Sequence, residues 1–583
     1  MPSSLIPQGD EYQVNTHTDD VQNRPVTTAL ADGGYVIVWD SKEQDAPTEQ
    51  GYGVYGQRYT ANGEKIDGEF LINTTTTNTQ GSASVAALAD GGFIVTWDSK
   101  DQDNPDDAED TDYGIYGQRF DAAGDTVGGE FQINTFIDGY QGNPSVAALT
   151  NGGFVVSWSS RHQDGSSLGV FAQRYNANGN TVGDEFLVTT ETDQSQSGTF
   201  VTALATGGFL VTWVSSNQDG QNGGIFGQRF KANGDPVGDE FQINTYTPKG
   251  QWGPNATALT DGGFVVTWYS EDNDGDSFGV FGQRYNGDGT TAGGEFQINT
   301  HSDGRQEKPS VTELPDGGFV VAWWGEDNQD GDFRGVFAQR FDANGNPVGV
   351  EFQVNTYTND IQDTVSIDTL ADGSIVMTWS SRYQDGSDRG IYSQKFAIGI
   401  SGTEGDDLME DIDGVGFMNG LGGDNTLLGL AGRDSLFGGE GNDIIKGGKG
   451  KDNLHGDGGD DFLKGGKGGD YLFGGAGNDI IKGGKGADII NGGAGDDLLY
   501  GNSGRDVFVF AANDGSDVIF DFKNGKDKFD LSAFGFDKKS DAKAHFFEKG
   551  SAKNDVVGFS FEGTEIKIKG LDLGDINGAD FII

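Results

Sequence analysis

Aspartate recurs every nine residues between positions 402 and 509 of this 583-residue chain, each time after a glycine-rich stretch. One unit reads Gly-Gly-Ala-Gly-Asn-Asp-Ile-Ile-Lys, and twelve such units follow one another without an insertion or deletion. Carboxylate and carbonyl oxygens are the ligands that Ca²⁺ prefers, and it takes roughly six to eight of them. A glycine-rich loop with one aspartate supplies about half of that shell. The spacing therefore predicts calcium sites between stacked loops.

The candidate metal ligands are the ten aspartates at the sixth position of these units. The second and third units have Gly416 and Asn425 there instead, so we expect weak sites at the start of the array. The eighth position is apolar in every unit, which argues against a glycine-rich disordered segment. The ten candidates are Asp407, Asp434, Asp443, Asp452, Asp461, Asp470, Asp479, Asp488, Asp497 and Asp506.

This pattern resembles the RTX, or hemolysin-type, calcium-binding repeat of proteins exported by type I secretion. The resemblance implies a parallel β-roll in which two units form one turn, loops stack every eighteen residues, and several calcium ions are held between them. The segment after residue 509 contains Asp-Val-Ile-Phe-Asp-Phe and Asp-Leu-Ser, and the chain ends in Asp-Phe-Ile-Ile. It resembles the C-terminal region of the same proteins, which implies an uncleaved export signal and folding outside the cell.

A second, longer repeat fills residues 11 to 396. Its anchor, Gly-Gly-Phe-Val-Val-Thr-Trp or a close variant, ends at seven tryptophans spaced 55 to 61 residues apart. Each repeat reads as four short antiparallel strands joined by glycine turns, without helical periodicity, which is typical of a propeller blade. Seven repeats predict a seven-bladed β-propeller, and an open β-solenoid or a string of small sandwiches is the alternative. The tryptophans are Trp39, Trp97, Trp158, Trp213, Trp268, Trp323 and Trp379.

The two ends of this repeat region complement each other. The last repeat stops before its fourth strand, whereas residues 11–16 carry an extra copy of that strand, so we expect them to pair with residues 390–396 and close the ring. In six repeats an arginine precedes a glutamate by eleven residues, which suggests cross-strand ion pairs, with Lys395 and Glu11 as the seventh. Solvated strand charges are the alternative. Gln22 and its six equivalents are candidates to ring one mouth of the channel.

The expected fold is therefore all-β, with a seven-bladed β-propeller followed by a calcium-binding parallel β-roll and a β-rich C-terminal cap. The expected boundaries are an N-terminal arm at 1–10, the propeller at 11–398, the roll at 402–509, and the cap with the secretion signal at 510–583. The high glycine count, 98 residues against 12 prolines, suits tight turns between many short strands.

Charge and composition limit the partners and the compartment. The formal net charge is −53, which argues against nucleic acid or an anionic membrane as partner. There is no cysteine, so disulfides are excluded. The first residues lack a charged segment followed by an apolar run, and no stretch has the length of a membrane span. Together with the repeats, these features predict an extracellular or cell-surface protein that uses the type I ABC secretion machinery.

No catalytic constellation is recognisable, and we expect a protein that is not an enzyme. The five histidines are scattered, and there is no His-Glu-x-x-His motif. A secreted calcium-binding structural or adhesive protein, self-assembling into a layer or filament, is the first hypothesis. The alternative is a carbohydrate-binding or carbohydrate-active propeller in which the roll serves export and folding only. Near-identity among the repeats favours the first, and the loop at 98–113 is the longest departure from it.

The outer rows of the roll are a candidate interface with another copy of the chain or a surface polysaccharide. Positions seven and nine of a unit point outward when position eight points inward. One face therefore stacks an apolar row beside a lysine row, and packing within the chain is the alternative. These rows are Ile444, Phe462, Ile480 and Leu498, and Lys446, Lys464 and Lys482.

Overall fold

A computed structural model describes residues 4–44, 51–103, 112–165, 167–220, 222–326, 329, 331–402, 405–410, 416–536, 538–548 and 556–583. The chain forms two compact units: Pro7–Ala397, and Met1–Ile6 together with Ile398–Ile583. Both units consist almost entirely of strands in the described ranges. None of the helices in these ranges is long and apolar enough to cross a membrane. Residues 104–111, half of the divergent loop at 98–113, lie outside the described residues.

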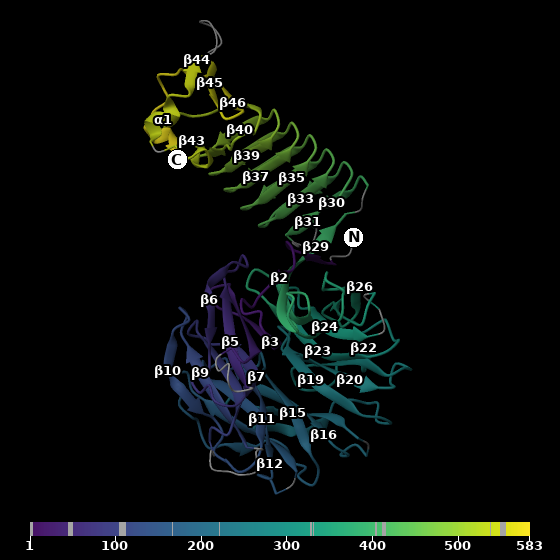
Figure 1. Ribbon diagram of the computed structural model, residues 1–583. Coiled ribbons are helices and arrows are strands. Elements are labelled where there is room, and N and C mark those ends of the chain that lie inside the picture. Colours follow the sequence, from purple (N-terminus) through teal and green to yellow (C-terminus); the bar gives the residue numbers. More distant parts are fainter. Residues whose placement is uncertain are drawn as a thin grey trace. The chain divides into compact units, whose positions relative to one another are not determined.

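Six separate four-stranded antiparallel sheets account for most of the Pro7–Ala397 unit (Figure 1). In each sheet, strands that are consecutive in the chain are neighbours. The prediction of an all-β propeller architecture is therefore confirmed. The sheets comprise β3 (Gln22–Ala29), β4 (Tyr35–Lys42), β5 (Tyr52–Tyr59) and β6 (Lys65–Leu71); β7 (Gln80–Ala87), β8 (Phe93–Lys100), β9 (Tyr113–Phe120) and β10 (Thr126–Gln132); β11 (Gln141–Ala148), β12 (Phe154–Arg161), β13 (Leu168–Tyr175) and β14 (Phe186–Leu187); β15 (Gln196–Ala203), β16 (Phe209–Ser215), β17 (Gly224–Phe230) and β18 (Pro236–Gln242); β19 (Gln251–Ala258), β20 (Phe264–Glu271), β21 (Phe278–Tyr285) and β22 (Phe296–Gln297); and β23 (Gln306–Glu313), β24 (Phe319–Glu326), β25 (Arg334–Phe341) and β26 (Pro347–Gln353).

The second strand of each sheet is buried on both faces, because sheets pack against each other on either side. All seven repeat tryptophans have no exposed surface. The preceding turn is held by an aspartate: in the first sheet, Asp32 Oδ1 accepts a hydrogen bond from Gly34 N at 2.9 Å. Gly33 has a φ of 89°, a conformation that favours glycine. This turn connects the inner strand β3 to the buried strand β4 and lets the two pair.

Within the described ranges there is no seventh separate sheet, so the predicted count of seven blades is not confirmed. The remaining strands β27 (Gln362–Thr369), β28 (Ile375–Arg382) and β29 (Arg389–Ser401) pair in sequence order but belong to a 13-stranded sheet. The reason is that β29 continues beyond the length of its equivalents, and its last residues pair with a strand of the roll. The strand β2 (Tyr12–Gln13) pairs antiparallel with β29, with Tyr12 opposite Ser393.

Glutamate side chains link successive sheets around the unit. A threonine after each outer strand donates its backbone N–H to a glutamate of the next sheet, over 2.6–2.8 Å. Glu11, beside β2, takes the same role as the glutamates of the complete sheets, and Gln384 also donates to it. The series is Thr16–Glu69, Thr74–Glu130, Thr135–Glu185, Thr190–Glu240, Thr245–Glu295, Thr300–Glu351 and Thr356–Glu11.

The expected arginine–glutamate pairs are wrong. Arg58 donates to the carbonyl of Ala122 in the next sheet over 2.7 Å, and Lys395 donates in the same way to Ala61 over 2.6 Å. The physical reason is a β-bulge immediately before the arginine, which shifts the register against the outer strand. The arginine and the glutamate therefore each bind a neighbouring sheet, and three of the arginines also pair with an aspartate in a turn of their own sheet: Arg119 with Asp90, Arg284 with Asp261 and Arg340 with Asp316.

The repeated glutamines are also placed differently from the expectation. Gln22 and its equivalents have no exposed surface, so they do not ring a channel mouth. In six of the seven positions an asparagine seven residues earlier donates its Nδ2 to the glutamine Oε1 over 2.9–3.4 Å. Its Oδ1 accepts a backbone N–H, as Asn15 does from Ile391 at 2.7 Å. Thr189 replaces that asparagine once, and there both amide atoms of the buried Gln196 have no hydrogen-bond partner.

The roll is built as its sequence predicts. Strands pair in parallel with the strand eighteen residues on, as Ile444 does with Phe462, so alternate units form two separate ladders (Figure 1). The eighth position of every unit is at most 2% exposed. One ladder contains β30 (Leu408–Glu410), β32 (Thr426–Leu428), β34 (Ile444–Lys449), β36 (Phe462–Lys467), β38 (Ile480–Lys485) and β40 (Leu498–Ser503), and the other contains β31 (Phe417–Asn419), β33 (Ser435–Glu440), β35 (Asn453–Gly458), β37 (Tyr471–Ala476), β39 (Ile489–Ala494) and β41 (Val507–Val509).

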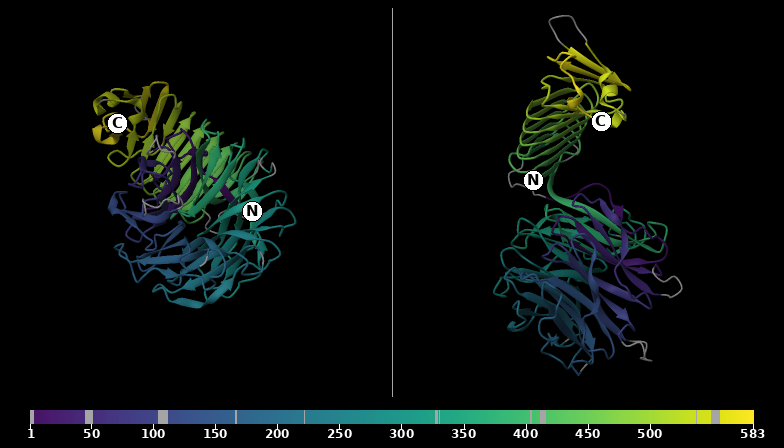
Figure 2. Two further views of the ribbon diagram at one scale, coloured as in Figure 1. Left: turned by 60° about the horizontal axis from the view of Figure 1, so that its bottom comes forward. Right: turned by 90° about the vertical axis from the view of Figure 1, so that its left-hand side faces the viewer.

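The C-terminal segment continues both ladders and adds an antiparallel hairpin (Figure 2). Its apolar side chains, including Phe529 and Ile566, extend the core formed by the eighth positions. The segment comprises β42 (Ser516–Ile519), β43 (Lys528–Asp530), η1 (Ser532–Phe534), α1 (Lys539–Lys543), β44 (Phe546–Glu548), β45 (Val556–Phe561), β46 (Thr564–Lys569), η2 (Gly578–Asp580) and β47 (Phe581–Ile582). At the other end of the chain, β1 (Ser4–Pro7) pairs with β29.

Deleting residues 1–17 should destabilise the Pro7–Ala397 unit, because it removes the β2 pairing and the contacts of Glu11 and Asn15. At roughly 1 kcal/mol per hydrogen bond, the loss in free energy of unfolding should be about 3 kcal/mol or more. Chemical denaturation measures it. Glu11→Ala should show part of the loss and the exposed Asp10→Ala none; an unchanged midpoint for the deletion would contradict this role of the N-terminal strand.

Thr189→Asn should stabilise the same unit by about 1–2 kcal/mol, because it supplies the asparagine that Gln196 lacks. The reciprocal change Asn134→Thr removes the partner of Gln141 and should destabilise by a similar amount. Thermal unfolding of the two variants beside the parent checks both signs. If both variants shifted the Tm equally in the same direction, the asparagine–glutamine contact would not be what determines their stability.

Candidate metal centre

The sixth-position aspartates form two stacked rows along the roll. Eight of the ten, from Asp443 to Asp506, accept a hydrogen bond on Oδ1 from the backbone N–H of the sixth residue one turn earlier, over 2.7–3.1 Å. Asp461 N, for example, donates to Asp479 Oδ1 at 2.8 Å. Nine of the ten candidates are at most 2% exposed, and Asp407, in the first unit, is half-exposed. The carboxylates are thus oriented by the backbone of the neighbouring turn.

The second carboxylate oxygen of these aspartates is buried without a hydrogen-bond partner. It lies over the glycine that opens its own unit: a Cβ placed at Gly474 would be 2.2 Å from Asp479 Oδ2. Burying a charged oxygen without a partner is costly, so such atoms call for a cation. The oxygens concerned are Oδ2 of Asp443, Asp452, Asp461, Asp470, Asp479, Asp488, Asp497 and Asp506.

Glycine at the fourth position allows backbone carbonyls to crowd around the loops. Gly468 has a φ of 138°, and a Cβ there would lie 1.4 Å from the carbonyl oxygen of Gly450, one turn earlier. Any other residue would exclude that carbonyl. Carbonyl and carboxylate oxygens on adjacent turns therefore converge, which is the donor set that Ca²⁺ prefers.

Burial changes the acidity of the rows. It raises the pKa of Asp461, Asp479 and Asp488 to about 7, and that of Asp452 and Asp506 to about 6. Repulsion between stacked carboxylates adds to the effect, as Asp497 does on Asp479. The ionised rows therefore destabilise the folded roll unless a cation neutralises them.

The donor set fits calcium better than a transition metal. Within the described ranges, no three His, Asp or Glu side chains cluster closely enough to hold a metal ion by themselves. Each loop supplies one carboxylate, and the rest of the donors must come from the backbone. Oxygen donors of this kind suit a hard cation, and calcium tolerates the irregular geometry of a loop.

Two carboxylates escaped the sequence analysis. Asp497 N donates to Asp517 Oδ1, and Asp506 N donates to Asp527 Oδ1, both over 3.1 Å, so each row has one further member. Both side chains are 1% exposed. The spacing within a row lengthens from eighteen residues to twenty before Asp517 and to twenty-one before Asp527, which hid both from a search for the nine-residue period. The signal was present, because Gly515 and Gly525 precede them at the usual distance and an apolar residue follows.

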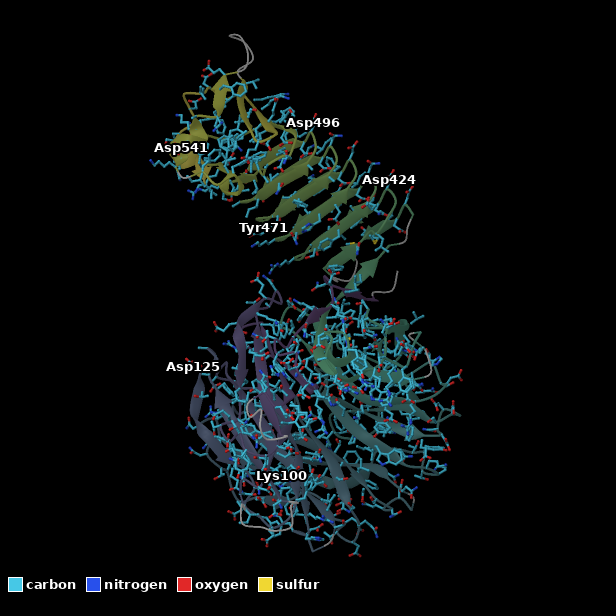
Figure 3. All side chains as sticks on the ribbon, viewed as in Figure 1. Lys100, Asp125, Asp424, Tyr471, Asp496 and Asp541 are labelled. Atoms are coloured by element: carbon cyan, nitrogen blue, oxygen red, sulfur yellow. The ribbon has the colours of Figure 1, made fainter. Side chains whose placement is uncertain are left out.

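A second row of polar side chains lies on the outside of one set of loops only. Fifth-position side chains of alternate units accept the backbone N–H of the fifth residue in the next turn, as Asp424 does from Asn442 at 2.8 Å. These side chains are exposed, and Asp424 and Asp496 are labelled in Figure 3. The fifth position of the other set is Arg433, Lys451, Arg505 or an uncharged residue. The two loop edges of the roll therefore differ in charge.

Residues 419–454, 446–481 and 473–508 each match the family of the RTX calcium-binding nonapeptide repeat, in blocks of four copies. The matched region runs over most of the roll and excludes the propeller. No curated protein sequence matches the chain. The roll therefore carries RTX repeats, which bind calcium and are typical of secreted proteins.

Several solved structures resemble the propeller region at low identity. A protein of unknown function from Dyadobacter fermentans is 10% identical, with 68% of this chain and 99% of that chain covered and a TM-score of 0.42. An α-L-arabinanase from Penicillium chrysogenum is 13% identical, with coverage of 66% and 98% and a TM-score of 0.38. A PL25 ulvan lyase is 9% identical, with coverage of 66% and 95% and a TM-score of 0.41.

Calcium binding should weaken as the pH falls from 8 to 5.5. Because burial raises the pKa of the row aspartates from the usual 3.8 to about 6 or 7, protons compete for the same oxygens in this window. By the same sign, the calcium-free roll takes up protons on folding and loses stability as the pH rises through about 7. We expect the calcium concentration at the midpoint of folding, followed by circular dichroism, to be at least about tenfold higher at pH 5.5 than at pH 8.

Two variants separate the buried row from the outer row. Asp479→Asn removes a buried carboxylate and should shift the calcium midpoint upward, whereas Asp460→Asn changes an exposed fifth-position side chain and should leave it nearly unchanged. The role given to the buried carboxylates would be contradicted if the calcium midpoint of the parent protein were the same at pH 8 and pH 5.5. It would also be contradicted if the two variants shifted the midpoint equally.

Proposed function

We propose that this protein is a secreted structural protein that folds on calcium outside the cell and assembles with further copies of itself into a surface layer or filament. The observation that carries the proposal is the pair of buried carboxylate rows, because a fold that buries so many unpartnered carboxylate oxygens depends on a cation. Calcium is scarce inside cells and abundant outside them. The roll then remains unfolded during export and folds after it.

The proposed calcium ligands are the sixth-position aspartates and the backbone carbonyls of the adjacent turns. Calcium would neutralise the stacked carboxylates and join each loop to the one eighteen residues away. Sites between two aspartates run from Asp434 to Asp506, and Asp517 and Asp527 extend them. The first turn is expected to be weaker, because Asn425 stands in the row and Asp407 is half-exposed.

We further propose that β27, β28, β29 and β2 act as a seventh blade. Three observations support this. Glu11 and Lys395 make the same contacts to adjacent sheets as their equivalents elsewhere. Thr27 N donates to Ser366 Oγ over 3.0 Å, as Val201 N does to Ser145 Oγ between complete sheets. The inner strands of the six sheets and β27 line one common cavity. The N-terminal strand then closes the ring and leaves no free sheet edge.

The proposed contact between copies uses the charged edges of the roll. One set of loops presents an exposed lysine row that repeats every eighteen residues, and the other presents an exposed polar row in which aspartates alternate with Asn442 and Asn478. Tyr471 and the pair Asp424 and Asp496 lie on different sides of the roll in Figure 3. Because the two rows lie on different edges of one roll, their pairing is heterologous and continues from copy to copy. The rows are Lys449, Lys467 and Lys485, and Asp424, Asp460 and Asp496.

The other lysine row packs partly within the chain. Lys482 Nζ lies 5.0 Å from the ring centroid of Phe462 and 5.5 Å from that of Tyr500. Ile444 is 41% exposed, while Phe462 and Ile480 are half-buried. The exposed lysines of the loop edge are therefore the better test of assembly than Lys446, Lys464 and Lys482.

Electron microscopy and light scattering of purified protein with and without calcium test the proposal. Ordered polymers should form only with calcium, and the triple variant Lys449→Glu, Lys467→Glu, Lys485→Glu should abolish them while keeping the calcium midpoint. The control Lys526→Glu, Lys528→Glu, Lys538→Glu changes the charge equally in the C-terminal segment and should still assemble. Calcium-loaded monomers in the parent protein, or equal loss in both variants, would refute assembly through this edge.

A further inference from the structure

The centre of the propeller holds a cavity of about 1260 Å³ lined by the inner strands β3, β7, β11, β15, β19, β23 and β27. In every one of these strands the residue two positions after the buried glutamine has a φ of 52–61° and lines the cavity. The strand bulges there, because its register against the next strand shifts at this point. The seven residues are Arg24, Ser82, Asn143, Gly198, Gly253, Lys308 and Thr364.

This left-handed conformation favours glycine, yet only two of the seven are glycine. Arg24 and Lys308 keep long cationic side chains at a position where a glycine would relieve the strain. Such strain persists where a side chain is needed for a function other than folding. The two cations are exposed and line the same cavity.

The charge at this end of the cavity is unusual for the chain, whose net charge is −53. The Arg24 side chain is 60% exposed and is directed by Ser82 Oγ at 3.2 Å and Asp40 Oδ2 at 3.6 Å. Arg305, 45% exposed, stands three residues before Lys308, and its guanidinium lies 5.0 Å from the ring centroid of Phe278. Arg305 also pairs with Glu307 over 3.5 Å, so the exposed cations that line the cavity at this end are Arg24 and Lys308.

A cluster of three aromatic side chains flanks the same end in the sheet of β19 to β22. Trp252, next to the cavity-lining Gly253, contacts Tyr269 and Phe278 with ring centroids 6.0 and 5.6 Å apart. All three are half-buried. The repeat does not require them, because the positions equivalent to Trp252 are Asn23, Gly81, Gly142, Ser197, Glu307 and Asp363.

We propose that this end of the cavity binds an acidic saccharide. Arg24 and Lys308 would hold its carboxylates, since charge-assisted hydrogen bonds to carboxylates are strong, and the Trp252 cluster would pack against the apolar face of a sugar ring. Polar side chains from the same bulges, such as Asn143 and Ser82, suit its hydroxyl groups. The site lies wholly in the Pro7–Ala397 unit, so it is independent of calcium-driven assembly by the roll.

The test is isothermal titration of the full chain, in excess calcium, with a four-residue oligomer of β-1,4-linked glucuronic acid. Cellotetraose, the neutral oligomer with the same linkage, is the ligand control. Arg24→Gly with Lys308→Gly should weaken binding at least about tenfold, and it should not lower the Tm, because Gly198 and Gly253 already occupy equivalent positions. Trp252→Ser, which copies Ser197, should weaken binding to a similar degree. Arg161→Ala with Lys231→Ala removes the same charge from exposed sites elsewhere and should bind as the parent does.

The site is supported if the parent binds the acidic oligomer saturably, the glycine variant and Trp252→Ser lose this binding, and the Arg161 and Lys231 control retains it. No saturable binding by the parent protein, equal binding of cellotetraose, or equal loss in the Arg161 and Lys231 variant overturns it. Because the glycine variant relieves backbone strain, loss of binding with a preserved or raised Tm separates a functional role from a structural one.

Discussion

The roll depends on one constraint: each loop buries one carboxylate, which stacks on the carboxylate of the corresponding loop in the next turn. The backbone N–H of one aspartate satisfies one oxygen of the next, and glycine brings carbonyl oxygens close to the other. The arrangement is complete only with a cation, because unpartnered buried charge is otherwise too costly. The apolar eighth positions form a narrow core between the two ladders, and they can close only when the loops on either side are neutralised.

The propeller is stabilised in a different way. Its buried surface is apolar and aromatic, and its polar contacts between sheets are neutral or paired, such as the asparagine–glutamine and threonine–glutamate links. Nothing in those contacts needs an ion. The chain therefore joins one unit whose fold depends on packing and hydrogen bonds to another that carries calcium-binding repeats and buries two rows of carboxylates.

Repetition leaves few positions free to vary, and those positions are informative. Packing and hydrogen bonding account for the repeated tryptophans, glutamines, glutamates and arginines of the propeller. They do not account for Trp252 or for long cations in a left-handed backbone conformation. In the roll, likewise, the fold requires the sixth and eighth positions, while the third and fifth are free to make one edge basic and the other acidic. Positions that the repeat does not need are therefore the ones free to carry a function.

The sequence by itself determined the roll and the propeller architecture, because both arise from local periods: nine residues with one apolar position, and about 55 residues with four strands. It could not reveal contacts between repeats. The bulge before Arg58 turned the arginine away from its expected partner, and the buried Gln22 accepts a hydrogen bond from Asn15, which lies just after β2. Asp517 and Asp527 were hidden by insertions that leave their stacking intact, and the long β29 merges the last propeller strands with another sheet. Which carboxylates share a row, and which cations meet at one cavity, depends on how turns and sheets stack, and only the tertiary structure decides that.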